Sequence, residues 1–367
     1  MINEKVFLPE EKIIYNLREL YESFGYKQYK IKKFEEYDLY ANNKDFLVSN
    51  KVITFTDTDG KLLALKPDVT LSIVKNTALK GETEKLYYNE NVYRVEKRTD
   101  SFKEIMQAGL EVIGEVDEYQ IYETLLLACK SLQTVSNDFI LNISDLGIVS
   151  GITGASNLTE KGKNTVFDAI KAKNFQLVKQ VLDDENVSGK VRDAILLLVS
   201  TYGDYKVIEE NISALSVTEE VNKKLKSLIK LAKSLESSGL SGKIKIDFSV
   251  LSDTNYYNGV VFNGVIYGAN GYALSGGEYD NLLKKMGKTA RAIGFAVYLD
   301  VLSKINGDGK KYQVDTVILY DDSVDLNRIS EQVNLLTNKG EKVLAVKSIP
   351  DTLTYKTLID FKGGQVK

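Results

Sequence analysis

Residues 104–114, EIMQAGLEVIG, alternate between apolar and polar side chains. In an extended chain, this pattern puts the two kinds of side chain on opposite faces. The apolar face holds Met106, Ala108, Leu110 and Val112, and the other face holds Gln107, Gly109 and Glu111. The segment is therefore expected to be a strand of a sheet that packs on one side. Its polar side suits a ligand, because a glycine lets a ligand approach the backbone, but it equally suits solvent.

Strand and helix patterns follow one another on both sides of this segment. The periodicities, turn residues and capping residues predict a mixture of short elements. We expect helices at 8–24, from 67 to 74 and at 117–132, a hairpin at 51–66, and strands at 85–96, 104–114 and 138–144. Residues 152–238 show mainly helical patterns and end in ESSGLSG, a flexible composition. Strands return after Lys243, a helix is expected through residues 293–305, and a strand–helix–strand unit follows residues 306–309.

These patterns predict an α+β fold in which helices flank an antiparallel sheet. A length of 367 residues suits two or three domains. We expect residues 1–150 and 240–305 to form one core, residues 151–239 to be a helical insertion in it, and residues 310–367 to be a small α/β segment.

The chain contains no histidine and one cysteine, Cys129. These counts exclude Ser-His-Asp and Cys-His catalysis, histidine-containing metal sites and thiolate zinc sites. We expect no metal and no cofactor. A lone thiol on a helix face fits an inert core residue in a reducing compartment.

The overall charge and the apolar pattern limit the partners. The net charge is −3, so no basic face for nucleic acid is expected. No apolar run reaches the length of a membrane span, and the first residues lack the pattern of a signal peptide. These features predict a cytoplasmic protein without a membrane or nucleic-acid partner.

Six short motifs occur in a fixed order: LKPDVT, VYRVE, MQAGLEVIG, NYYNG, GGEYD and AIGFAV. One of them alone would be weak evidence. In this order, they resemble the catalytic core of class II aminoacyl-tRNA synthetases, specifically that of the histidyl-tRNA synthetases. The resemblance covers most of residues 1–305 apart from the insertion, and residues 310–367 resemble a truncated anticodon-binding domain.

The resemblance implies a binding site for histidine. Matching residues in that family contact the amino group, the imidazole or the side-chain pocket, and Glu111 is expected to meet the imidazole. The implied histidine-binding residues are Asp68, Thr70, Gln107, Glu111, Tyr257 and Tyr279, with Asp68 standing where glutamate is usual. Carboxylates suit an ammonium group, while amide, carboxylate and phenol groups suit the imidazole nitrogens.

The residues that handle ATP in the family are largely replaced. Arg94 stands where the family grips the α-phosphate, and it is a candidate anion-binding residue. Arginines of the family are replaced by Ser252, Val301 and Glu278, a small residue by Tyr298, and a proline by Lys32. Adenylate formation needs fixed positive charge, and each lost donor costs about 10²–10³ in rate. No catalytic residue is therefore expected.

A pocket without a catalyst resembles the family of synthetase paralogues that serve as regulatory subunits of ATP phosphoribosyltransferase in histidine biosynthesis. That family implies a short catalytic subunit as partner, histidine as effector and a homodimeric core. A protein needed when histidine is scarce is easier to make without it, although compositional drift gives the same count. A free-standing histidine-binding or tRNA-related module and a divergent active synthetase are the alternatives.

Overall fold

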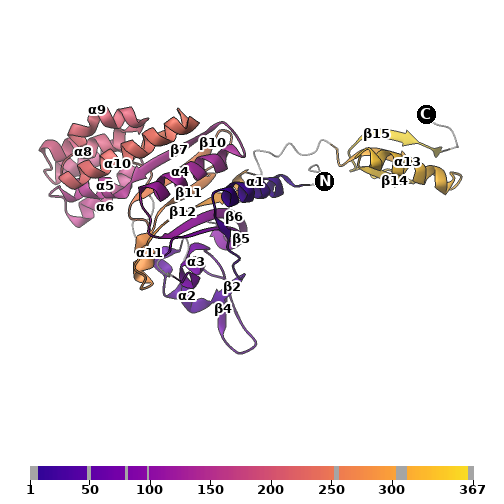
Figure 1. Cartoon of the computed structure of the whole chain (residues 1–367), viewed down its shortest axis with the longest axis horizontal. Helices are drawn as coiled ribbons and strands as arrows, with labels where there is room; N and C mark the ends of the chain where they lie inside the picture. Colours follow the sequence, from indigo (N-terminus) through magenta and orange to yellow (C-terminus); the bar gives the residue numbers. More distant parts are fainter. Residues whose placement is uncertain are drawn as a thin grey trace. The chain divides into compact units, whose positions relative to one another are not determined.

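The computed structural model describes residues 7–47, 51–78, 82–96, 99–251, 256–302 and 312–362. The chain divides into two compact units, Met1–Asn306 and Gly307–Lys367. Figure 1 shows the first unit built around one large sheet, with the helices between residues 146 and 235 gathered at one end.

The main sheet of the first unit has nine strands within the described residues. Neighbouring strands run antiparallel except for the parallel pairs β1–β5 and β7–β9. The predicted α+β class is confirmed, and the sheet is mixed rather than purely antiparallel. In spatial order the strands are β1 (Lys27–Gln28), β5 (Glu84–Glu96), β6 (Ser101–Gly114), β12 (Arg291–Tyr298), β11 (Leu274–Glu278), β10 (Val260–Ile266), β7 (Phe139–Asp145), β9 (Ile244–Asp247) and β8 (Tyr202–Gly203).

One face of the sheet carries the helices α1 (Pro9–Ser23) and α4 (Glu118–Gln133). Both form where the sequence predicts them, and Asp117 caps α4 by accepting from the amides of Tyr119 and Gln120. The apolar face of β6 packs into this core, which also includes Cys129. Burial raises the pKa of the Cys129 thiol, as expected of an unreactive core residue.

The opposite face of the sheet carries a second core with shorter elements around it. The predicted hairpin is present as the paired strands β3 (Thr54–Thr56) and β4 (Leu62–Leu65), and the helix predicted after Pro67 is present as α3 (Thr70–Asn76). Leu71 N donates to Asp68 Oδ1 at 2.8 Å, so the aspartate satisfies a free amide at the start of α3. The elements on this side are β2 (Phe34–Glu36), α2 (Tyr37–Ala41), the 3-10 turn η2 (Lys44–Phe46), β3 (Thr54–Thr56), β4 (Leu62–Leu65), α3 (Thr70–Asn76) and α11 (Asp280–Lys285).

The helical region between β7 and β9 packs as a layer of short helices (Figure 1). Its apolar residues continue the core beneath α4. The strand β8 comes from this region and pairs with β9, so the layer is hydrogen-bonded to the sheet. The elements are α5 (Leu146–Gly154), α6 (Glu160–Lys171), α7 (Phe175–Asp184), α8 (Gly189–Ser200), α9 (Tyr205–Leu215), α10 (Glu219–Leu235) and the π-helical turn η3 (Glu236–Leu240).

The helix predicted through residues 293–305 is wrong. Residues 291–298 form β12, and only the four residues of α12 (Leu299–Leu302) are helical among those described there. Ile293 is fully buried in the core on one face of the sheet, and Ala292 is fully buried in the core on the other face. A strand buried on both faces has no polar alternation, so a short apolar run of this kind cannot be told from a helix by periodicity.

The second unit is a small parallel sheet with one helix. The strand–helix–strand unit predicted there is present, and β15 adds a strand that the sequence analysis missed. Ile318 of β13 packs with Ile329 and Leu336 of the helix. The elements are β13 (Val314–Leu319), α13 (Leu326–Asn338), β14 (Val343–Val346) and β15 (Tyr355–Asp360), in the spatial order β14-β13-β15. Among the described residues of the chain, none of the helices has the length and apolar character needed to cross a membrane.

Candidate functional site

A cavity of about 540 Å³ lies on the polar side of β6. This volume falls within the range of small-molecule sites, roughly 300–1,000 Å³. The cavity gathers side chains from β5, β6, β10, β11, β12, the start of α3 and the insertion. All seven residues predicted from the sequence line it: Asp68, Thr70, Arg94, Gln107, Glu111, Tyr257 and Tyr279.

Glu111 is a buried carboxylate held by hydrogen bonds from two other parts of the fold. Its side chain is 2% exposed, and both carboxylate oxygens accept hydrogen bonds. Thr70 Oγ1 donates to Oε1 at 2.8 Å, and the Tyr279 hydroxyl donates to Oε2 at 2.6 Å. Burial raises the pKa of Glu111 to about 8, although these two hydrogen bonds favour the charged form. Near neutral pH the residue therefore carries a proton that it can share with a basic ligand.

Asp68 and Arg94 form an ion pair at the same cavity. Arg94 Nη2 lies 3.3 Å from Asp68 Oδ2, and Arg94 Nε donates to the carbonyl oxygen of Pro67 at 2.6 Å. Burial raises the pKa of Asp68, while Arg94 and the amide of Leu71 oppose this shift. The arginine thus holds a neighbouring carboxylate in place in addition to facing the cavity.

Three tyrosines form one wall of the cavity. The Tyr256 ring packs against Tyr257 at 4.6 Å and against Tyr279 at 6.0 Å between centroids. Phe46 of η2 extends this aromatic cluster. Tyr257 and Tyr279 were predicted from the sequence, whereas Tyr256 was not, although the adjacent tyrosines of NYYNG are a visible signal. Neighbours in an irregular loop need not point to opposite sides, so both can line the cavity.

Gly109 has a different role from the expected one. A Cβ on this residue would lie 2.5 Å from the Tyr88 hydroxyl and 2.3 Å from the Phe295 carbonyl oxygen. Tyr88 is paired directly with Gly109 across β5 and β6, and it lines the cavity itself. The glycine therefore makes room for a buried phenol of the protein rather than for a ligand at the backbone.

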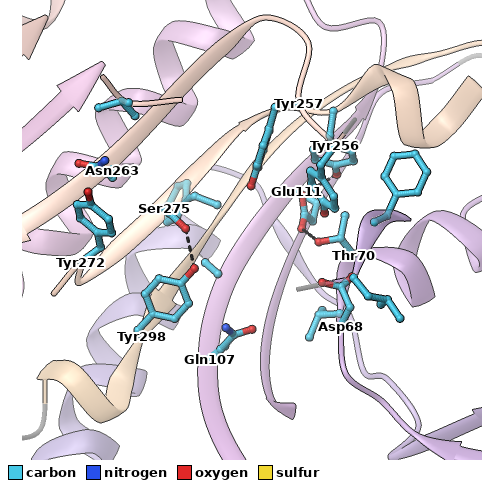
Figure 2. A pocket seen from close by; sticks show the side chains of 18 of the residues that line it. Asp68, Thr70, Gln107, Glu111, Tyr256, Tyr257, Asn263, Tyr272, Ser275 and Tyr298 are labelled. Carbon is cyan, nitrogen blue, oxygen red and sulfur yellow. Dashed lines mark hydrogen bonds between the residues drawn. The ribbon is translucent and has the colours of Figure 1, made fainter. Parts of the chain in front are cut away.

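Figure 2 shows two groups of side chains in the cavity. Asp68, Thr70 and Glu111 lie together with the tyrosine pair of NYYNG, and a second, uncharged group lies away from them. In that second group, Ser275 and Tyr298 are joined by a hydrogen bond of 2.6 Å. The members of the uncharged group labelled in Figure 2 are Asn263, Tyr272, Ser275 and Tyr298. No motif marked these four as ligand-facing, apart from Tyr298 at a position where the family has a small residue.

Only some of the positions at which this chain departs from the synthetase motifs line the cavity. The ring of Tyr298 lines the cavity, whereas Val301 and Lys32 do not. Ser252 lies outside the described residues. Glu278, which replaces an arginine of the family, lies on the face of β11 opposite to that of Ser275, which lines the cavity. It accepts from Val260 N at 2.7 Å and pairs with Arg291, so its charge is not presented to the cavity.

The order of elements, the mixed sheet and the cavity define a class II aminoacyl-tRNA synthetase-like protein. The family model for histidyl-tRNA synthetase matches residues 4–302. The ATP phosphoribosyltransferase regulatory subunit of Caldanaerobacter subterraneus subsp. tengcongensis is 30% identical over 92% of this chain and 91% of its own. That of Clostridium kluyveri is 29% identical over 88% and 85%. The chain belongs to the histidyl-tRNA synthetase family and, within it, to the ATP phosphoribosyltransferase regulatory subunits.

Solved structures agree with this assignment. A Bacillus halodurans structure described as an ATP phosphoribosyltransferase regulatory subunit/histidyl-tRNA synthetase has a TM-score of 0.77 and 26% identity, covering 96% of this chain and 94% of that one. An ATP phosphoribosyltransferase complex from Thermotoga maritima contains a chain with the same fold, at a TM-score of 0.62 and 16% identity. It covers 80% of this chain and 98% of that one.

Proposed function

We propose that this chain binds free histidine in the cavity and, as the partner of a short catalytic subunit, adjusts the first step of histidine biosynthesis. The observation that carries the proposal is the pair of hydrogen bonds that hold Glu111 inside the cavity. A buried carboxylate with a raised pKa, fixed by Thr70 and Tyr279, is built to meet a titratable ring nitrogen.

The other groups of the cavity fit the rest of the amino acid. Asp68 stands at the start of α3 where it can accept from an ammonium group. Gln107, which is 2% exposed, offers both a donor and an acceptor to the second imidazole nitrogen. The aromatic wall of Tyr256, Tyr257 and Tyr279 supplies the apolar contact that a planar ring needs.

The same cavity is poorly suited to making an aminoacyl adenylate. Among its described lining residues, the cations are Arg94 and Lys171, and Arg94 is engaged with Asp68 and the Pro67 carbonyl. Phosphoryl and adenylyl transfer depend on positive charge fixed around the phosphates. We expect the purified chain to lack histidine-dependent ATP–pyrophosphate exchange and tRNA charging, and activity above a no-protein control would favour the divergent synthetase instead.

The decisive experiment is to co-express the chain with a short-form ATP phosphoribosyltransferase. The two chains are expected to co-purify, phosphoribosyl transfer is expected to need both, and histidine is expected to inhibit it. Glu111→Ala is expected to raise the inhibitory histidine concentration by at least about tenfold, since a charge-assisted hydrogen bond contributes about 1.5–3 kcal/mol. If the Glu111→Ala variant assembles normally and histidine inhibits it as before, the histidine site lies on the catalytic subunit or at the interface between the subunits.

Two further properties belong to the proposal. The core is expected to be a homodimer, since a fold with one broad sheet offers an isologous interface, and light scattering at micromolar concentration tests this. A reducing compartment such as the cytosol fits the single cysteine of the chain, Cys129, which is buried and cannot form an internal disulfide.

A further inference from the structure

Lys171 brings a positive charge from the insertion to the cavity. It is the last residue of α6, it is exposed, and its side chain lines the same cavity as Glu111. Within the part of the chain that the structure describes, Lys171 makes neither an ion pair nor a hydrogen bond through its side chain. A lysine in this state retains donors for a ligand that enters from the solvent side.

The position of Lys171 is fixed by an anchor two residues further along the chain. Lys173 Nζ lies 2.7 Å from Asp247 Oδ2 at the end of β9, and it sits 4.8 Å from the centre of the Tyr202 ring. The same aspartate accepts from the amide and hydroxyl of Ser249, which lines the cavity. These contacts fix the end of α6 next to residues that line the cavity.

The backbone at this anchor is unusual for its residue type. Lys173 has φ of 51°, in the left-handed region that normally takes glycine or asparagine after a helix. A lysine there costs about 1 kcal/mol relative to an ordinary conformation. A glycine would remove that cost but also the ion pair with Asp247, so the strained lysine serves to hold the corner of α6 against the core.

The charges in the cavity leave one part of an amino acid without a partner. Asp68 and Glu111 suit the ammonium and imidazole groups, which leaves the α-carboxylate. Arg94 already gives one donor to Pro67 and another to Asp68. We infer that Lys171 binds the α-carboxylate of the histidine, so that the ligand joins the insertion to the core.

This inference rests on the proposed binding of histidine and assigns it a further contact. A ligand bound by both Lys171 and Glu111 adds a second link between the end of α6 and the core, beside the ion pair of Lys173 with Asp247.

The test measures binding of two probes to the full-length chain by calorimetry. L-histidine has the carboxylate and histamine lacks it, while both keep the ammonium and imidazole groups. Lys171→Ala is expected to weaken histidine binding about tenfold and to leave histamine within about twofold of wild type. Lys171→Arg is expected to retain most of the histidine affinity, and Lys161→Ala, an exposed lysine of the same helix, is the matched control.

The outcomes separate this inference from the proposed function. If wild type binds histidine and Lys171→Ala binds it equally well, Lys171 has no such role, although histidine still binds. An equal loss for histidine and histamine would likewise overturn it, since the carboxylate would not be the group concerned. If wild type binds neither probe, the proposed histidine site itself is wrong.

Discussion

Gly294 lies directly opposite Glu111 in the paired strands β12 and β6, and it makes room for the glutamate side chain. A Cβ on Gly294 would stand 1.8 Å from Glu111 Oε2 and 2.5 Å from the carbonyl oxygen of Leu110. Because Tyr279 holds that Oε2 atom, the carboxylate cannot turn away without losing a buried hydrogen bond. The Glu111 carboxylate can take this position only because residue 294, in the neighbouring strand, is a glycine.

Gly294→Ala is therefore expected to damage both stability and binding. Overpacking against the Leu110 backbone should lower the free energy of unfolding by about 1–3 kcal/mol. Histidine affinity should fall by more than about tenfold, because Glu111 is displaced. Urea denaturation and calorimetry measure the two effects. Gly154→Ala is the matched control, since a Cβ there meets nothing within 4 Å. A Gly294→Ala protein with wild-type affinity would show that the position of Glu111 does not matter.

The pKa of Glu111 predicts a particular dependence of stability on pH. The folded protein retains the proton up to about pH 8, whereas the unfolded chain releases it near pH 4.5. Between these values the unfolded state binds fewer protons, so this residue lowers stability as the pH rises, by up to about 1.4 kcal/mol per pH unit. Below pH 4.5 the effect is absent, and above pH 8 it is complete.

Glu111→Gln removes this effect while keeping the size of the side chain. Its unfolding free energy is expected to fall less steeply from pH 5 to pH 8 than that of wild type. Urea titrations at several pH values provide the comparison. Other buried carboxylates with raised pKa, such as Asp68 and Glu278, remain in both proteins, so the difference between the curves isolates Glu111. Parallel curves would mean that Glu111 is ionised in the folded protein at neutral pH.

The affinity for histidine is expected to have a plateau between about pH 6.5 and pH 8. Free imidazole gains its proton near pH 6.5, and Glu111 loses its own near pH 8. Between these values the pair shares one proton, while outside them binding must first release or take up a proton. The tyrosines at the site stay neutral throughout, because burial raises their pKa values above 10: Tyr88, Tyr256, Tyr257 and Tyr279. Calorimetry across pH 5–9 measures the profile, and an affinity that is constant above pH 8 would contradict the assignment of Glu111.

Alternation in the sequence was enough to predict the strand that carries the site. Gln107 and Glu111 had to share a face of β6 with one another, whatever the rest of the fold. Their partners could not be found in this way, because Thr70 and Tyr279 come from distant elements and meet Glu111 only once the sheet is assembled. The assignment of those residues depended on the resemblance to a family rather than on local patterns.

Local sequence patterns did not predict features that depend on burial or on the surroundings of a charged side chain. The apolar run of β12 predicts a helix as readily as a strand, because a strand buried on both faces lacks alternation. The replacement of a family arginine by Glu278 predicts a change of charge at the site, whereas Glu278 pairs with Arg291 and accepts from the amide of Val260 on the other face of β11. Nothing near Lys171 in the sequence indicates that the end of α6 reaches the cavity.

The position of Glu278 gives the last prediction, which concerns restoring the arginine of the synthetase motif. Glu278→Arg would place a buried positive charge beside Arg291 and leave the amide of Val260 without an acceptor. A buried amide left without an acceptor costs about 1–3 kcal/mol, and the new arginine would face the half-exposed Arg291, so thermal denaturation should show a destabilised protein. ATP–pyrophosphate exchange should remain absent, because the side chain does not face the cavity. Glu278→Gln keeps an acceptor for Val260 and should be affected less, and a Glu278→Arg protein as stable as wild type would refute the structural role assigned to this ion pair.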